Sequence, residues 1–257
     1  MRPHLLISND DGIDSVFLRK LVEAHRTDFD ITVVAPKHEQ SWTGRSMTRR
    51  RNLRVEPQKA YPVPAYSVDG TPTDCVNLAL GHLLSEPPVA VLSGVNVGIN
   101  CSLTLFLNSG TVAAASEGAI WGLPALAFSQ QVPKPFFEAI AAGRQDEWPE
   151  VMQSIEISCQ RAVEFTLARL AEPTDPTQAR IDNINFPNPI QADSPVRRTR
   201  LWRRRGAPLH TCQPDGTYAF GYQKGESLQI DDDHDAAWLE KKHISHSVVC
   251  LGALAAD

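Results

Sequence analysis

The chain lacks a cysteine pattern, a long apolar run and a basic leader. Its five cysteines are scattered, odd in number and without a C-x-x-C pair, which argues against a disulfide framework and against a zinc site. No run of about 18 uninterrupted apolar residues occurs, so we expect no membrane span. No pattern of a basic and then an apolar region opens the chain. Together these absences favour a cytoplasmic protein without a membrane partner.

An excess of positive charge is also lacking. The net charge of −5 argues against a nucleic-acid polymer as a partner. Arginines are nevertheless concentrated in residues 45–54 and 197–205, and aspartates in residues 231–235. Such runs are usually solvated faces. The first run follows a candidate site, where it could attract an anionic substrate.

Apolar strands alternate with helical segments in the first half of the chain. The expected strands are residues 5–8, 31–35, 89–92 and 125–129. The expected helices are residues 15–25, 71–84 and 112–121. This order predicts an α/β fold with a doubly wound, mostly parallel, Rossmann-like sheet. At 257 residues and 42% hydrophobic, the chain is long and apolar enough for one large α/β core, alone or with an appendage.

Two segments are expected outside that core. Residues 47–68 alternate and carry three prolines, which favours a protruding hairpin or excursion. A long helix (148–170) and a strand (184–187) are followed by predicted hairpins, a short helix and a last strand over residues 244–251. We therefore expect a Rossmann-like core over residues 1–195 and a C-terminal hairpin or arm over residues 196–257.

The stretch Ser-Asn-Asp-Asp-Gly, residues 8–12, follows the first strand directly. Ligands of open α/β sheets bind beyond the carboxyl ends of strands. Adjacent carboxylates such as Asp10 and Asp11 repel each other unless a cation or a proton lies between them, and Mg²⁺ or Mn²⁺ suits such oxygen ligands. A solvated Asp-Asp-Gly turn explains the tetrapeptide equally well when it is taken alone.

Two further polar side chains follow neighbouring strands. Ser41 lies in the loop after the second strand and Asn96 in the segment after the strand over 89–92, where glycines also allow a close backbone approach. Both are expected at the same edge of the sheet as Asp10, where a hydroxyl or amide oxygen can bind a hard cation. Each is also explained as an ordinary loop residue.

The start of the helix near residue 112 is a candidate anion site. Ser109, Gly110 and Thr111 precede it, and free N–H groups with the positive end of the helix dipole favour phosphate there. An ordinary Ser/Thr cap is the alternative. For Asp74, which follows Thr71 by three residues, we prefer a capping role to a catalytic one. Trp42 and Phe220 are candidate stacking platforms for a base, although aromatic residues more often pack.

Four segments in order resemble the SurE family, the stationary-phase survival proteins that are metal-dependent nucleotide phosphatases. They are residues 8–15, 34–46, 66–76 and 93–112, and residues 122–125 support them. The resemblance covers about residues 5–130. The chain departs from the family pattern at Trp42, at Asn108, at residues 16–17 and in the tail after residue 244.

The resemblance implies roles for particular residues. It implies one divalent cation per subunit, Mg²⁺ or Mn²⁺, with ligands from the first, second and fourth segments: Asp10, Asp11, Ser41 and Asn96. It implies phosphate contacts at Ser109, Gly110 and Thr111. Family members act on nucleoside monophosphates and are commonly homodimers or homotetramers. The resemblance therefore implies that residues 1–195 form the phosphatase core and that the arm over residues 196–257 is used for oligomerisation.

We therefore expect a metal-dependent phosphomonoester hydrolase of the 5′-nucleotidase or acid-phosphatase-like kind. Asp10 and Asn96 would act at the catalytic cation, and Asn9 would orient water or phosphate. One rival hypothesis is a non-catalytic nucleotide or phosphate binder on the same scaffold. The other is a phosphatase for a different small phosphoester.

Overall fold

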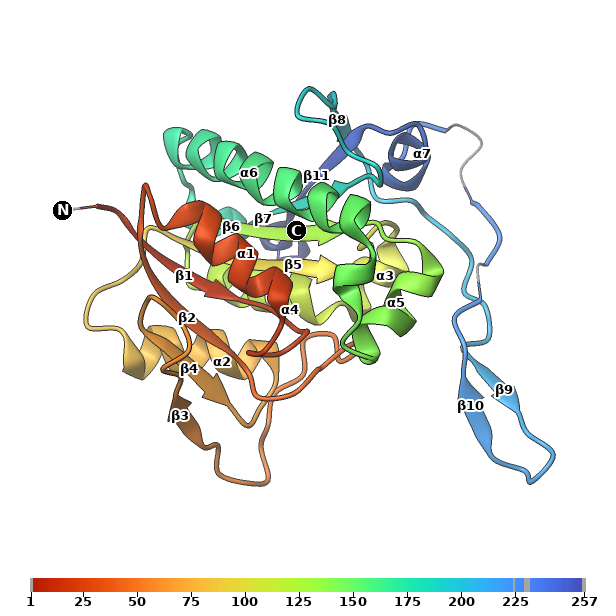
Figure 1. Cartoon of the computed structure of the whole chain (residues 1–257), viewed down its shortest axis with the longest axis horizontal. Helices are drawn as coiled ribbons and strands as arrows, with labels where there is room; N and C mark the ends of the chain where they lie inside the picture. Colours follow the sequence, from red (N-terminus) through yellow and green to blue (C-terminus); the bar gives the residue numbers. More distant parts are fainter. Residues whose placement is uncertain (1, 224, 229–231, 256–257) are drawn as a thin grey trace.

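The computed structural model describes residues 2–223, 225–228 and 232–255, and within them a nine-stranded sheet runs in the order β3-β4-β2-β1-β5-β6-β7-β11-β8 (Figure 1). The parallel central strands are β4 (Ala65–Val68), β2 (Asp30–Pro36), β1 (His4–Ser8), β5 (Ala90–Val97), β6 (Ala125–Gln130) and β7 (Arg180–Phe186). The remaining strands are β3 (Val55–Pro57), antiparallel to β4, β11 (Ile244–Cys250), antiparallel to β7, and β8 (Val196–Thr199), parallel to β11. The predicted doubly wound, mostly parallel sheet is confirmed.

Helices cover both faces of this sheet. One face carries α1 (Val16–His25), α5 (Lys134–Ala141) and α6 (Pro149–Ala171), and α1 and α6 lie in front of the sheet in Figure 1. The other carries α2 (Pro72–Leu78), which continues as a π-helical turn (Ala79–Leu83), and α4 (Gly110–Ile120). Shorter helices are α3 (Leu103–Asn108), α7 (Asp235–Glu240) and 3₁₀ turns at Gln145–Glu147, Pro176–Gln178 and Leu251–Ala255. No helix in the described part of the chain is long and apolar enough to cross a membrane.

Strand β1 shows why the sheet is buried on both faces. Leu5 and Ile7 pack into the cluster beneath α1 and α6, whereas Leu6 joins the cluster beneath α2 and α4. Successive side chains of a strand point to opposite faces, so a strand covered on both sides must be apolar throughout. The uninterrupted apolar run of the sequence follows from that geometry.

The segment 47–68 differs in part from the excursion that we expected. Its second half forms β4, which pairs with β2 in register from Val33 opposite Ala65 and therefore extends the central sheet. β3 then pairs with β4 at the sheet edge. The prolines stand outside or at the ends of these short strands, where a missing N–H costs no ladder hydrogen bond.

The chain after residue 196 contributes to the sheet and also projects from it. β8 and β11 are sheet strands, whereas β9 (His210–Cys212) and β10 (Tyr218–Phe220) form a separate hairpin that protrudes at the lower right of Figure 1. We call residues 200–233 the arm. The division at residue 195 stays a prediction, but the final strand packs with the core. Its buried Ser245 and Ser247 each share a 2.8 Å hydrogen bond with Thr199, so polar residues line this interior position.

Candidate active site

The carboxyl ends of β1, β2 and β5 meet at one cleft of about 350 Å³. Asp10 follows β1, Ser41 lies in the loop after β2, and Asn96 is near the end of β5; all three line this cleft together with Ser109. Asp11 lines an adjoining cavity of about 500 Å³ that Ser41 shares. The structure thus brings the residues predicted from separate segments to one edge of the sheet, because parallel strands end on the same side.

Asp10 is held by two neighbouring elements. The Thr111 hydroxyl donates a 2.6 Å hydrogen bond to Asp10 Oδ1, and the backbone N–H of Gln40 donates to the Asp10 carbonyl oxygen at 2.8 Å. Burial raises the pKa of the Asp10 carboxyl to about 6, although the hydrogen bonds from Thr111 oppose that rise. Gly110 leaves the room for this arrangement, since a Cβ there would stand 2.6 Å from Asp10 Cβ.

Asp11 lies beside Asp10 and is turned toward β5. The backbone N–H of Val97 donates a 3.3 Å hydrogen bond to Asp11 Oδ2. Loss of surrounding water raises the pKa of the Asp11 carboxyl well above its ordinary range, and repulsion from Asp10 raises it further. Both effects disfavour two carboxylates in this place, and a bound cation reverses both by neutralising the charge.

The hydroxyl and amide donors complete an oxygen set that suits a hard cation. Ser41 Oγ donates to Glu39 Oε1 at 2.7 Å, and the partly exposed Asn96 lines the same cleft. Within the described residues, no group of three or more His, Cys, Asp and Glu side chains is placed to hold a metal. A cation here would therefore depend on the Ser41 and Asn96 oxygens beside the two aspartates. That all-oxygen donor set fits Mg²⁺ or Mn²⁺.

Glu39 is a residue of this cleft that the sequence analysis did not single out. Its carboxylate lines the cleft with Asp10 and contributes to the raised pKa of both Asp10 and Asp11. Its position in the sequence could have indicated it, because Glu39 lies in the loop at the carboxyl end of β2, two residues before Ser41.

Asn9 is fully buried behind the aspartates. Its Nδ2 donates to the Gly12 carbonyl oxygen at 3.0 Å, while its Oδ1 has no hydrogen-bond partner among the described residues. A buried acceptor without a partner costs about 1–3 kcal/mol. The role predicted for Asn9, which is to orient water or phosphate, stays a prediction.

The three predicted phosphate-binding residues occupy the start of α4. Ser109 Oγ accepts a hydrogen bond from the Val112 N–H at 3.1 Å, so Ser109 is the N-cap, as in the alternative interpretation. Gly110 and Thr111 form the first turn, directly against Asp10. The positive end of the helix dipole therefore points at the paired carboxylates, where an anion and a cation would be neighbours. Phosphate binding by these residues stays a prediction.

Three expectations near the site are revised or confirmed. β5 continues to Val97, so Asn96 belongs to the strand rather than to a loop. Gly94 serves strand packing rather than ligand approach, because a Cβ there would collide with the Phe128 carbonyl oxygen of β6. The capping role preferred for Asp74 is confirmed by a capping box in which its Oδ2 accepts the Thr71 N–H at 2.9 Å.

Comparisons with known proteins place the chain in a family. Residues 5–208 match the family model described as survival protein SurE. A 5′-nucleotidase SurE of Methanosarcina barkeri is 34% identical over 206 residues, which is 79% of this chain and 74% of that protein. A 5′-nucleotidase SurE of Methanococcoides burtonii is 29% identical and covers 98% of this chain and 95% of its own.

The fold comparison extends over nearly the whole chain. The crystal structure of the SurE protein from Aquifex aeolicus superposes with a TM-score of 0.73 at 26% identity, covering 97% of this chain and 94% of that one. The sheet order, the paired aspartates at the end of β1 and the family match lead to one conclusion. The chain belongs to the SurE family.

Proposed function

We propose that this protein is a metal-dependent phosphomonoester hydrolase acting on nucleoside monophosphates, a 5′-nucleotidase. The observation that carries the proposal is the 2.6 Å hydrogen bond from Thr111 to Asp10, which joins the first turn of α4 to the paired carboxylates. A phosphate at that helix start would lie beside a cation held by the aspartates. The relatives named 5′-nucleotidase SurE support the same substrate class.

The residues of the cleft divide into two groups by chemistry. Asp10, Asp11, Ser41 and Asn96 would hold one divalent cation, Mg²⁺ or Mn²⁺. When bound, such a cation supplies Lewis-acid activation of water and neutralises phosphoryl charge.

The start of α4 binds and orients the substrate. The N–H groups of its first turn and the helix dipole attract the phosphoryl oxygens and stabilise the charge that they carry in the transition state. Thr111 fixes the Asp10 carboxylate toward the reacting phosphate. Asn9 Oδ1, buried and unpaired among the described residues, is available to accept a hydrogen bond from an oriented water.

A covalent aspartyl-phosphate route is disfavoured. That chemistry uses a nucleophilic carboxylate, but the chain has no Asp-x-Asp pair in the cleft, and both aspartates are engaged by backbone or side-chain donors. The site supports direct attack of water on the phosphoryl group. This is the route that we propose for an acid-phosphatase-like hydrolase.

The test is phosphate release from nucleoside monophosphates and from p-nitrophenyl phosphate with Mn²⁺, Mg²⁺ or EDTA. We expect turnover with a divalent cation, loss of turnover with EDTA, and a decrease in kcat of about 10²–10³-fold in Asp10→Asn. Asp69→Asn is the matched control, because Asp69 pairs with Arg51 on the surface. A folded protein without turnover under any of these metals would overturn the proposal.

We also propose that the protein self-associates through the arm, as a homodimer or homotetramer. The arm exposes Phe220 and Leu228, and its two strands pair only with each other in the described part of the chain. Exposed apolar groups of this kind mark association surfaces. Light scattering after gel filtration should give a mass above that of the 28.3 kDa chain, and a monomeric mass at all concentrations would contradict this proposal.

The cysteines support a cytoplasmic location. All five are unpaired in the structure, and Cys75, Cys101 and Cys159 are buried. Unpaired thiols are the usual state in a reducing compartment.

A further inference from the structure

A second cavity opens beside the site cleft. It encloses about 240 Å³ and shares Trp42, Ile99 and Leu105 with the cleft that contains Asp10 and Ser109. A molecule whose phosphate lies at the start of α4 could therefore place its other end in this cavity without leaving the protein surface.

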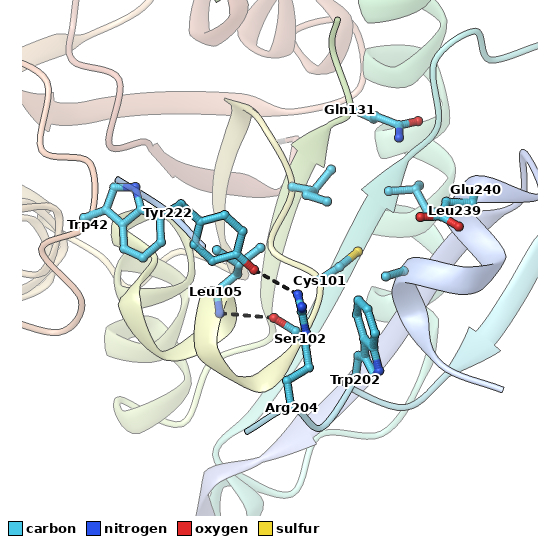
Figure 2. A pocket seen from close by; sticks show the side chains of 12 residues that line it. Trp42, Cys101, Ser102, Leu105, Gln131, Trp202, Arg204, Tyr222, Leu239 and Glu240 are labelled. Atoms are coloured by element: carbon cyan, nitrogen blue, oxygen red, sulfur yellow. Dashed lines mark hydrogen bonds between the residues drawn. The ribbon is translucent and has the colours of Figure 1, made fainter. Parts of the chain in front are cut away.

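The cavity is a slot between aromatic walls. Figure 2 shows Trp42 and Tyr222 on one side, Trp202 and Leu239 on the other, and Arg204 between them. Trp42 comes from the loop that carries Ser41, whereas Trp202, Arg204 and Tyr222 come from the arm. The slot therefore exists only where the arm returns to the core.

The walls are held by contacts among themselves. Arg204 Nη1 donates a 3.2 Å hydrogen bond to the Tyr222 hydroxyl, and the Arg204 guanidinium stands 4.2 Å from the centre of the Trp202 ring. The Trp202 ring also stacks on His234 at 4.5 Å. Trp42 contacts the Tyr222 ring at 5.6 Å. His234 and Arg204 thus both pack against the Trp202 ring, so the groups left to face a flat ligand are Trp42, Tyr222 and the Arg204 guanidinium. These contacts preorganise the slot, because few rotamers remain to be ordered on binding.

Of the two roles considered for Phe220, a stacking platform or packing, the structure shows packing. Its ring packs edge-on against Trp42 at 4.8 Å and does not line the cavity. Phe220 therefore fixes Trp42 at the rim, and the ligand-facing aromatic residue of the arm is Tyr222.

We propose that this slot is the leaving-group subsite, which receives the flat heteroaromatic base of the substrate. The inference rests on the proposed phosphatase function and names the part of the substrate that the arm recognises. Stacking on aromatic side chains contributes about 1–3 kcal/mol per base and tolerates every base, because each has a π-face. The Arg204 guanidinium adds a cation that attracts such a face. A phosphoester without an aromatic group receives no stacking contribution to its binding free energy from this slot.

Binding of the base is tested first, without catalysis. Adenosine, which has no phosphate, is titrated into the full-length protein in EDTA while tryptophan fluorescence is followed, since Trp42 and Trp202 line the slot. We expect saturable quenching and an affinity about tenfold weaker in Tyr222→Leu. Tyr218→Leu is the matched control, because Tyr218 lies in β10 just before Tyr222, is 67% exposed and does not line the slot.

Discrimination between substrates is tested second, with Mn²⁺ present. The ratio of kcat/KM for adenosine monophosphate to kcat/KM for glycerol phosphate should fall about tenfold in Tyr222→Leu and stay at the wild-type value in Tyr218→Leu. An unchanged ratio in Tyr222→Leu overturns the subsite, as does wild-type protein that binds no adenosine. A loss of adenosine affinity in Phe137→Leu instead would place the base against Phe137, which lines both the Asp10 cleft and the adjoining cavity, and so would also overturn it.

The two proposals fail in different ways. Adenosine binding that depends on Tyr222, in a protein that hydrolyses no phosphoester, would support the subsite and overturn the hydrolase. Turnover of phosphoesters with an adenosine affinity and a substrate ratio that do not depend on Tyr222 would support the hydrolase and overturn the subsite.

Discussion

Asp10 is oriented by residues that are distant in sequence. Its side chain accepts from Thr111 and its backbone from Gln40, while the adjacent surface of α4 is kept flat by Gly110. These neighbours come from two elements, helix α4 and the loop after β2. The position of the carboxylate is therefore a property of the assembled site, and a small steric change on α4 should act on it directly.

Gly110→Ala tests this dependence at the scale of one methyl group. The new Cβ would lie 2.6 Å from Asp10 Cβ and 2.9 Å from Asp10 Oδ2, so the carboxylate must shift. We expect kcat/KM to fall about 10²-fold, which is typical of a misplaced catalytic group. Overpacking should also lower the free energy of unfolding by about 1–3 kcal/mol. Steady-state kinetics and urea denaturation measure the two effects.

The matched control is Gly81→Ala. A Cβ at Gly81 meets its nearest neighbour, Trp121, at an ordinary 3.8 Å, so this variant should keep full activity. Wild-type kinetics and stability in Gly110→Ala would mean that the Asp10 side chain is not confined by α4.

At the scale of the element, helix starts supply both stability and chemistry. α2 begins with a capping box of Thr71 and Asp74, and Asp74 additionally accepts the Thr48 N–H at 3.1 Å. α4 begins with the Ser109 cap and directs its first turn at the active-site cleft. The same local sequence signal, a Ser or Thr followed by a helix, therefore has a structural role in one case and a proposed ligand-binding role in the other.

Asp74→Ala should separate these roles. Loss of the Thr71 and Thr48 hydrogen bonds is expected to lower the free energy of unfolding by about 1–2 kcal/mol, because two backbone N–H groups lose their acceptor. Activity of the folded fraction should be unchanged. Denaturant unfolding with a parallel activity assay makes the comparison.

Asp69→Ala provides the control for this variant. Asp69 forms an exposed pair with Arg51, which contributes about 0–1 kcal/mol. A large loss of turnover in folded Asp74→Ala would assign Asp74 a chemical role in place of the capping one.

At the scale of the whole molecule, His25 couples two helices on one face of the sheet. Its Nδ1 lies 2.9 Å from the Leu21 carbonyl oxygen of α1, and its Nε2 lies 3.1 Å from Thr166 Oγ1 of α6. Burial lowers the pKa of His25 to about 4. The folded protein therefore prefers the neutral imidazole more strongly than the unfolded chain does.

The sign of the pH dependence follows from that preference. The contribution of His25 to stability is complete above its unfolded pKa of about 6.5 and is lost as the pH falls toward 4, a change of about 3 kcal/mol. Unfolding free energies measured between pH 7 and pH 4 should fall less steeply in His25→Gln than in the wild type. The difference between the two proteins isolates His25, since the buried carboxyls are common to both. If the free energy of unfolding falls equally steeply with pH in both proteins, the His25 imidazole does not titrate in this range.

The arm also acts at the scale of the molecule. Its residues complete a cavity next to a site that the core alone supplies, and its hairpin extends away from the sheet. Substrate recognition and self-association are thereby proposed for one segment of the chain. The local sequence of the arm, with short alternating stretches and turns, indicates hairpins but not what they approach.

The sequence by itself determined the central βαβ pattern and the candidate donors. Apolar runs such as Leu5–Leu6–Ile7 identify strands buried on both faces, and the carboxyl ends of such strands are where the sheet places Asp10, Ser41 and Asn96 together. Local caps at Thr71 and Ser109 were also readable, because a cap depends on residues only three apart.

Only the tertiary structure decided the features that depend on distant partners. α5 and β8 were not predicted, and β4 joined the sheet, because short segments gain their conformation from the elements they pack against. Buried Ser245 and Ser247 look exposed in sequence until Thr199 supplies their hydrogen bonds. In the same way, the contact of Thr111 with Asp10 and the aromatic slot closed by Tyr222 join residues about a hundred or more positions apart, which no local pattern records.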